Sequence, residues 1–266
     1  EGLPAIVTIV LALSVSRMVR ARTIVRRLAS VETLGAVEIV CSDKTGTLTQ
    51  NRMTVMECCL EGTVYDRTKL AGMLAGWERA EGENSVVSHF VRGSILCNDS
   101  ILLEEGELGD PTEMALVHLA DDSGIPYRRI REKYPRVDER GFDSERKMMT
   151  TVHRMSGGEQ ISYTKGAAER VLGACSRQYR QGTITKLDER SREEIERVQH
   201  RLMQEGRRVL ALAMNPEGTA EEKNLVFLGL CSMQDPIRPE AAEVVADFKK
   251  AGVTTVMITG DHPDTA

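Results

Sequence analysis

Two short apolar runs, one near each end of the chain, lead directly into polar turns. Residues 37–41 (VEIVC) precede Asp43, and residues 253–258 (VTTVMI) run into Thr259. Runs of this length and composition are typical of strands buried in a parallel sheet. Before the second run, residues 239–252 carry apolar side chains at helical spacing, two lysines in the last turn and a closing glycine. A helix that leads into a strand is the unit of a parallel sheet, so the pattern predicts an α/β fold.

Asp43 follows the first of these strands, at the edge where α/β sheets bind their ligands. A carboxylate there can attack a phosphoryl group and form an aspartyl phosphate, which divides one difficult step into two easier ones. Lys44, the Thr45 hydroxyl and the backbone amides around Gly46 are suited to hold the transferring oxygens. Mg²⁺ held by Asp43 and Thr45 would offset the charge that meets the carboxylate. Asp43, Lys44 and Thr45 are therefore candidate catalytic residues. For Asp-Lys-Thr by itself an ordinary polar turn after a strand is favoured, and only the longer match at 43–49 described below overturns that preference.

The composition excludes several classes of protein. The chain has 266 residues, 35 Lys and Arg against 40 Asp and Glu, a net charge of -5 and only 4% aromatic residues. It therefore has neither the charge nor the stacking surface of a nucleic-acid-binding protein. Its six cysteines form no CxxC pair, which argues against a disulfide scaffold or a zinc ribbon. Neither a P-loop pattern nor GxGxxG occurs, so a P-loop ATPase or a kinase is disfavoured.

The start of the chain combines an apolar run with a basic cluster. Thr8 and Ser14 are the only polar residues between positions 3 and 15, and five arginines follow between 17 and 27. A membrane-spanning helix needs roughly 20 apolar residues, so this run is too short unless the chain begins part-way through a span. A signal peptide would carry its positive charge before the apolar run. Two interpretations stay open: a buried core helix, or part of a span with its arginines on the cytoplasmic side.

Two acidic residues are placed to begin helices. In GDPTE, Asp110 suits the N-cap and Glu113 suits the reciprocal contact, which is the pattern of a capping box. Asp188 can cap a second helix that Gly206 would end. The run at 207–214 (RRVLALAM) beyond that glycine is typical of a strand.

Seven consecutive residues, DKTGTLT at 43–49, resemble the phosphorylation motif of the P-type ATPases. EGLP at 1–4 resembles the end of the PEGLP segment in the fourth transmembrane helix of the type II cation pumps. The chain is thus similar, from end to end, to a central fragment of a calcium-pump-like type II P-type ATPase. Further segments match in family order: GDPTEMAL (109–116), FDSERKMMT (142–150), KGAAE (165–169), RVLALA (208–213), DPIRPE (235–240) and TGDHPDTA (259–266).

This resemblance implies a haloacid-dehalogenase-like, parallel-sheet phosphorylation domain, incomplete here, with a large inserted α+β nucleotide-binding domain. Part of a transmembrane helix would precede it, and the chain from about residue 17 onward would be cytoplasmic. The family's GDGxNDxP loop and its TGE-bearing actuator domain are not among these residues. We therefore expect this stretch to bind nucleotide but not to pump. The implied boundaries are 1–19 for the piece of transmembrane helix, 20–30 for the stalk, 31–51 and 232–266 for the phosphorylation domain, and 52–231 for the nucleotide-binding domain.

The same resemblance implies ATP-driven cation transport through an aspartyl-phosphate intermediate, with ATP as the substrate and Mg²⁺ as the cofactor. The expected partners are ATP, the transported cation and, through the N-terminal helix, the lipid bilayer. Calcium is suggested because Pro4 is the last residue of EGLP, where sodium/potassium pumps resemble EGLL. Glu1 would be a ligand of the transported cation. The nucleotide-binding residues implied by the matched segments are Glu113, Phe142, Lys147, Lys165, Gly166, Arg208, Thr259, Gly260 and Asp261.

Each implied role has a plainer alternative. Phe142 resembles the aromatic residue on which adenine stacks, but a core phenylalanine is the alternative. Lys165 resembles the lysine of the nucleotide site, with Gly166 letting the backbone approach the ligand, and the alternative is a solvated surface lysine. Arg208 resembles an arginine that reaches the phosphates, or is simply a charge at the start of a strand. Contact with the nucleotide and the capping box explain Glu113 equally well.

The sequence also departs from the family pattern, and two other functions stay open. Ala168 stands where the family usually has proline, and Ser144 stands where animal calcium pumps have an arginine, so one phosphate contact would be missing. A soluble haloacid-dehalogenase-type phosphatase would carry a second Asp two residues after its nucleophile, but that position is Thr45. The other alternative is a nucleotide-binding module without turnover, against which the intact Asp43 argues.

Overall fold

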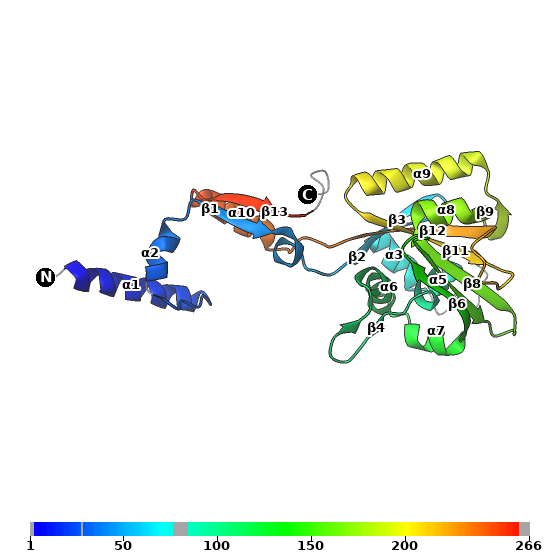
Figure 1. The fold of residues 1–266 in the computed structure, drawn as a ribbon, viewed down its shortest axis with the longest axis horizontal. Coiled ribbons are helices and arrows are strands. Elements are labelled where there is room, and N and C mark those ends of the chain that lie inside the picture. Colours follow the sequence, from blue (N-terminus) through cyan, green and yellow to red (C-terminus); the bar gives the residue numbers. More distant parts are fainter. Residues whose placement is uncertain (1–2, 28, 77–84, 261–266) are drawn as a thin grey trace. The chain divides into compact units, whose positions relative to one another are not determined.

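The computed structural model describes residues 3–27, 29–76 and 85–260, which fall into two compact units (Figure 1). The first unit contains the described residues up to Thr49 together with Ile237–Gly260. The second unit contains the described residues of Gln50–Pro236. The first unit is therefore built from two segments that are far apart in the sequence.

The first unit contains a two-stranded parallel sheet, as the apolar runs predict. Its strands are β1 (Ile39–Asp43) and β13 (Thr254–Ile258), and their register puts Asp43 opposite Ile258. The helix α10 (Ala241–Lys250) leads into β13, and a glycine with a φ of 78° follows its end. The predicted helix, the two strands and their parallel pairing are confirmed. The predicted burial of the strands is wrong, because every residue of β1 and β13 is exposed or half-buried in the described unit.

Two helices, α1 (Leu3–Arg20) and α2 (Ala29–Gly35), precede β1. Within the described part of the chain, no helix combines the length and the hydropathy needed to cross a membrane. Most of the described apolar side chains of α1 are exposed and none is fully buried, with exposed fractions of 60% for Ile6 and 61% for Leu13. The interpretation of the apolar run as a buried core helix is therefore wrong.

The second unit is built on a nine-stranded sheet. Its strands are β2 (Thr54–Leu60), β3 (Thr63–Asp66), β6 (Arg136–Asp143), β7 (Met148–Arg154), β8 (Gln160–Ala167), β9 (Cys175–Arg180), β10 (Thr183–Lys186), β11 (Arg208–Asn215) and β12 (Leu225–Gln234). Seven of them run in the order β10-β9-β12-β11-β8-β7-β6, and β2 pairs with both β12 and β3. Neighbouring strands are antiparallel except for β9 and β12, which are parallel. The unit is therefore mixed α/β with a mostly antiparallel sheet.

Helices cover both faces of this sheet, so the unit has three layers (Figure 1). The helices are α3 (Arg67–Leu74), α5 (Val86–Leu96), α6 (Pro111–Asp122), α7 (Tyr127–Lys133), α8 (Ala168–Ala174) and α9 (Glu189–Gln204), and a hairpin of β4 (Ile101–Leu102) and β5 (Glu107–Leu108) precedes α6. Leu212 and Met214 of β11 share one apolar core with α3, α5, α6 and α7. Ala211 and Ala213 share the other core with α8 and α9. This alternation follows from the two-residue period of a strand.

The helix α9 begins and ends as the sequence predicts. Asp188 Oδ1 accepts a hydrogen bond from the N–H of Ser191 at 2.8 Å, which caps the first turn. Ile195 and Leu202 are buried against the sheet. Gly206, with a φ of 71°, follows the last turn, and β11 begins two residues later.

Two buried histidines make the stability of this unit depend on pH. Burial lowers the pKa of His89 and of His153 to about 4. Between that value and about 6.5, the unfolded chain binds more protons than the folded chain, so the free energy of unfolding falls as the pH falls through this window. We expect a loss of up to about 3 kcal/mol for each histidine.

Denaturant unfolding of the chain between pH 7 and pH 4 measures this loss. The variant His153→Gln should lose less stability over that range than the wild type. Replacing the exposed His200 of α9 by Gln is the matched control and should leave the pH dependence unchanged. An identical pH dependence in His153→Gln and the wild type would contradict the assignment.

Candidate functional site

The predicted nucleotide-binding residues of the second unit come together where β6, β7 and β8 lie side by side. A register shift in the pairing of β6 with β7 puts Gly141 and Phe142 opposite Met149. Met149 in turn lies opposite Lys165 on β8. Neighbouring strands are roughly 5 Å apart, so Phe142 and Lys165 belong to one row of residues across the sheet, about 10 Å apart along it.

Phe142 lies on the surface rather than in the core. Its exposed fraction is 66%, which is high for a phenylalanine, and it sits in a β-bulge, a feature that re-aims side chains. The turn that follows is held by Asp143, whose Oδ1 accepts the N–H groups of Glu145 and Arg146 at 3.0 and 2.9 Å. These N–H groups lower the pKa of Asp143. The interpretation of Phe142 as a core residue is therefore wrong.

Lys165 is buried and ion-paired, with only 6% of its surface exposed. Its Nζ lies 2.5 Å from Glu113 Oε1 and donates to the Cys97 carbonyl, also at 2.5 Å. The interpretation of Lys165 as a solvated surface lysine is therefore wrong. Because the pair lies between β8 and the first turn of α6, it holds a charged donor and a charged acceptor next to each other.

The capping box at the start of α6 is only half present. Asp110 Oδ1 accepts the N–H groups of Thr112 and Glu113 at 2.8 and 3.3 Å, as predicted. The Glu113 carboxylate instead accepts the N–H of Asp99 at 2.8 Å and pairs with Lys165. The predicted reciprocal contact of Glu113 is therefore wrong, because a buried ammonium group is a stronger partner than a backbone amide at a helix start.

Arg208 reaches the same helix start from β11. Its Nη1 donates to Thr112 Oγ1 at 2.6 Å, and Arg208 is otherwise exposed. Thr112 and Glu113 are neighbours in the first turn of α6, so this turn links Arg208 with Lys165. Lys147, the residue before β7, is exposed and has a φ of 56°.

Gly166 is required by the protein's own backbone. A Cβ atom at this position would lie 2.2 Å from the Lys147 carbonyl oxygen and 2.8 Å from the Met148 Cα. The N–H of Ala167 donates to the same carbonyl at 2.9 Å. The close approach that the glycine permits within the protein is therefore to Lys147 and Met148, where β7 begins.

The predicted phosphorylation residues come together in the first unit. Asp43 is the exposed last residue of β1, and Thr259 and Gly260 directly follow β13. Because the strands are parallel and Asp43 lies opposite Ile258, Lys44 and Thr259 leave the sheet at the same edge. Two other predicted residues, Glu1 and Asp261, lie outside the described residues.

Two residues to which the motifs gave no role hold the loop after Asp43. The buried Thr49 hydroxyl donates to the Lys44 carbonyl at 3.2 Å and accepts the N–H of Gly46 at 3.1 Å. Arg238 Nη2 donates to the Gly46 carbonyl at 3.1 Å. Gly46 has a φ of 77°, which favours glycine. The signal for both residues was their place inside the matched segments DKTGTLT and DPIRPE.

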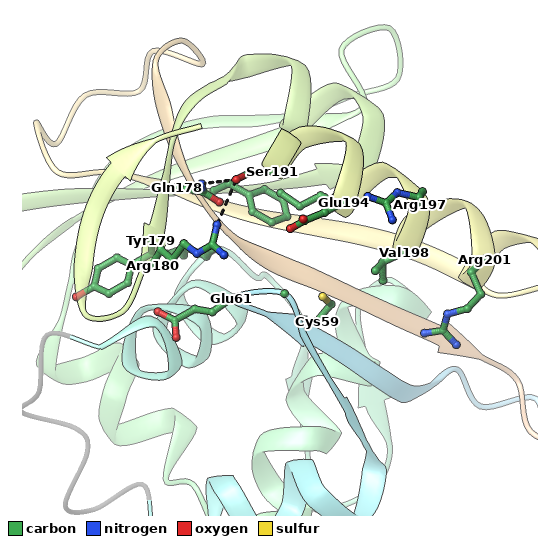
Figure 2. Close-up of a pocket in the computed structure, with 14 residues that line it drawn as sticks. Cys59, Glu61, Gln178, Tyr179, Arg180, Ser191, Glu194, Arg197, Val198 and Arg201 are labelled. Atoms are coloured by element: carbon green, nitrogen blue, oxygen red, sulfur yellow. Dashed lines mark hydrogen bonds between the residues drawn. The ribbon is translucent and has the colours of Figure 1, made fainter. Parts of the chain in front are cut away.

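A separate cleft of about 450 Å³ lies between α9 and the sheet (Figure 2). Cys59 of β2 and Val198 of α9 line it from opposite sides, together with the charged Arg180, Glu194 and Arg197. The predicted nucleotide-binding residues do not line it. Lys165 and Glu113 meet on the side of the sheet covered by α5 and α6, so this cleft is not the predicted site.

Several known proteins are similar to this chain in sequence. Residues 86–240 match the model of the family described as P-type ATPase, cytoplasmic domain N. A calcium-transporting ATPase 1 from Bacillus cereus is 40% identical over 272 residues, which cover 100% of this chain and 29% of the relative. The human calcium-transporting ATPase type 2C member 1 is 38% identical over 276 residues, covering 100% of this chain and 29% of the relative. A calcium-transporting ATPase 1 from Lactococcus lactis is 37% identical over 274 residues, with 100% and 30% covered.

The chain belongs to the P-type ATPases. The predicted resemblance to the type II, calcium-pump-like members is confirmed by these relatives. The chain spans about 30% of the length of the relatives named here. The roles of individual site residues stay predictions.

The contact between Gly166 and Lys147 can be tested by adding one methyl group. Gly166→Ala should displace the start of β7, because the new Cβ would overlap the Lys147 carbonyl oxygen. We expect the free energy of unfolding to fall by about 1–3 kcal/mol. Gly173→Ala in α8 is the control, because a Cβ there meets nothing within 4 Å. Equal stability of Gly166→Ala and the wild type in urea unfolding would contradict the assignment.

Proposed function

We propose that this chain is the part of an ATP-driven cation pump that binds ATP and accepts its γ-phosphoryl group on Asp43. The observation that best supports this function is the register of β1 and β13, which brings the loops after Asp43 and Ile258 to one edge of a parallel sheet. The family membership supports an ATPase, and an intact carboxylate at position 43 supports the covalent step.

We propose the domains implied by the resemblance. Residues 31–51 and 232–266 would belong to a haloacid-dehalogenase-like phosphorylation domain, and 52–231 would be the nucleotide-binding domain. The division of the structure near residues 49 and 237 supports these boundaries. Residues 1–19 would belong to a transmembrane helix and 20–30 to a stalk, which the exposed apolar side chains of α1 and the arginines after them support.

The second unit would bind the nucleotide along the row from Phe142 to Lys165. The exposed ring of Phe142 would stack on adenine. Lys165 and Glu113 compensate each other's charge, so together they offer a donor and an acceptor to an uncharged base. Lys147 and Arg208 are exposed and would attract the phosphates.

The first unit would carry out the phosphoryl transfer. An oxygen of the Asp43 carboxylate forms a bond to the γ-phosphorus of ATP, the bond to the β,γ-bridging oxygen breaks, and ADP leaves. Lys44, Thr45 and Thr259 would hold the equatorial oxygens. The hard oxygen donors of Asp43 and Thr45 fit Mg²⁺, which would neutralise charge on the phosphates. Thr45 supplies no general base, so the acyl phosphate would persist longer than in a phosphatase.

The transported cation would be Ca²⁺. The similar relatives are named calcium-transporting ATPases, and Pro4 follows Glu1, Gly2 and Leu3 in the matched segment. Glu1 would be a ligand of the cation within the membrane, and the chain from about residue 17 onward would be cytoplasmic.

The proposed nucleotide site predicts weaker binding when its residues are truncated. Phe142→Ala should weaken ATP binding to the chain by roughly 5-fold or more, because base stacking on an aromatic side chain contributes about 1–3 kcal/mol. Lys165→Ala should also weaken it, because it removes a donor and leaves the Glu113 carboxylate uncompensated. Isothermal titration calorimetry measures both effects.

Two control variants accompany these measurements. Phe142→Tyr keeps the ring and should retain most of the affinity. Arg190→Ala removes an exposed charge from α9 and should leave the affinity unchanged. Wild-type affinity in both Phe142→Ala and Lys165→Ala would refute the proposed site.

The proposed covalent step predicts a labelled intermediate in the whole pump. ATP labelled at the γ-phosphate, with Mg²⁺ and Ca²⁺, should give a protein-bound phosphate that hydroxylamine releases and that Asp43→Asn abolishes. Asp247→Asn in α10 of the same unit is the control and should label normally. Labelling that persists in Asp43→Asn would refute the nucleophile, and no labelling in the wild type would favour the binding module without turnover.

A further inference from the structure

A carboxylate from a loop far along the sequence, Glu222, is buried against the hairpin that carries Phe142. Glu222 belongs to the segment between β11 and β12, and its side chain is only 5% exposed. It forms an ion pair with Arg146, lies 3.4 Å from Arg140 Nη1 and accepts a hydrogen bond from Thr150 Oγ1 at 3.2 Å. None of the sequence motifs matched above includes Glu222.

Arg146 connects this carboxylate with the residues on both sides of Phe142, through the backbone of Gly141 and the side chain of Asp143. Its Nη2 donates to the Gly141 carbonyl at 2.6 Å, one residue before the ring. Its Nε lies 3.9 Å from Asp143 Oδ1, one residue after the ring. The guanidinium group therefore bridges the bulge that carries Phe142, and Glu222 holds that guanidinium through its Nη1.

The charges explain why a carboxylate is needed there. Arg140 and Arg146 bring two positive charges to one short hairpin, and Glu222 is the acidic side chain that contacts both. With an uncharged group at position 222, the guanidinium of Arg146 would no longer be compensated at its Nη1. It would turn toward solvent, and the Gly141–Arg146 contact that shapes the bulge would weaken.

We propose that Glu222 is a positioning residue for the nucleotide site: acting through Arg146, it holds the bulge so that the Phe142 ring is presented for stacking on a purine base. This inference rests on the proposed function, because it assumes that Phe142 meets the base. Glu222 itself does not touch the nucleotide. Its effect is therefore specific to the base and absent for a ligand that consists of phosphates alone.

The test compares ATP with inorganic tripolyphosphate as ligands of the chain, by calorimetry. Glu222→Gln should weaken ATP binding by roughly 5-fold, the lower end of the loss expected for an aromatic stack, and leave tripolyphosphate binding unchanged. Glu221→Gln is the matched control, because Glu221 is the exposed neighbour in the same loop. Its affinity for both ligands should equal that of the wild type.

A double variant identifies the route of the effect. If Glu222 acts through Phe142, then Glu222→Gln should cause no further loss in a Phe142→Ala background. Additive losses of affinity, or an equal loss for ATP and tripolyphosphate, would overturn the proposal. A merely structural role of Glu222 would weaken the binding of both ligands. Arg146→Lys keeps the charge but cannot reach both Glu222 and Gly141, so it should reproduce the loss for ATP; it also serves as the test if Glu222→Gln fails to fold.

The outcomes also separate this inference from the proposed function. If Phe142→Ala binds ATP like the wild type, the proposed site itself is wrong. If Phe142→Ala weakens ATP binding while Glu222→Gln and Arg146→Lys do not, the site stands and the positioning role of Glu222 is wrong.

Discussion

The parallel pairing of β1 with β13 is the constraint on which the rest of the chain depends. The two strands come from opposite ends of the sequence, so the chain between them must leave and return at neighbouring points. Within the first unit, Thr49 pairs with Ile237, and within the second, the N–H of Gln50 donates to the Pro236 carbonyl at 3.0 Å. The outgoing and returning segments therefore lie side by side, and everything between them can fold around its own core without disturbing the strand pair.

The second unit contains a buried ion pair, Lys165 with Glu113, between its sheet and α6. A lysine and a glutamate buried side by side lose hydration, and such pairs contribute little to stability compared with apolar residues. Lys165 and Glu113 nevertheless occupy the junction between the sheet and α6, where Cys97 and Asp99 satisfy their remaining hydrogen bonds. The pair therefore contributes little to folding, and its proposed role is to offer a donor and an acceptor to the ligand.

The sequence predicted those features whose cause is local. The Asp188 cap and the α10–β13 unit depend on residues a few positions apart, and the structure has both. The capping contact of Glu113 was wrong because a partner 52 residues away competes for the same carboxylate. The bulge at Phe142 and the role of Glu222 could not be predicted, since strand register and long-range ion pairs depend on how distant segments meet.

The segment FDSER shows how one motif contains two kinds of residue. A side chain that binds a ligand must keep part of its surface free of contacts within the protein, and most of the Phe142 side chain is exposed. A side chain that positions another residue must instead have its polar groups paired within the protein. The guanidinium of Arg146 is paired in this way with Gly141, Asp143 and Glu222. In the sequence these residues look equally functional because they lie four positions apart in one matched segment. Only their burial and their partners separate the residue proposed to contact the ligand from the residue proposed to position it.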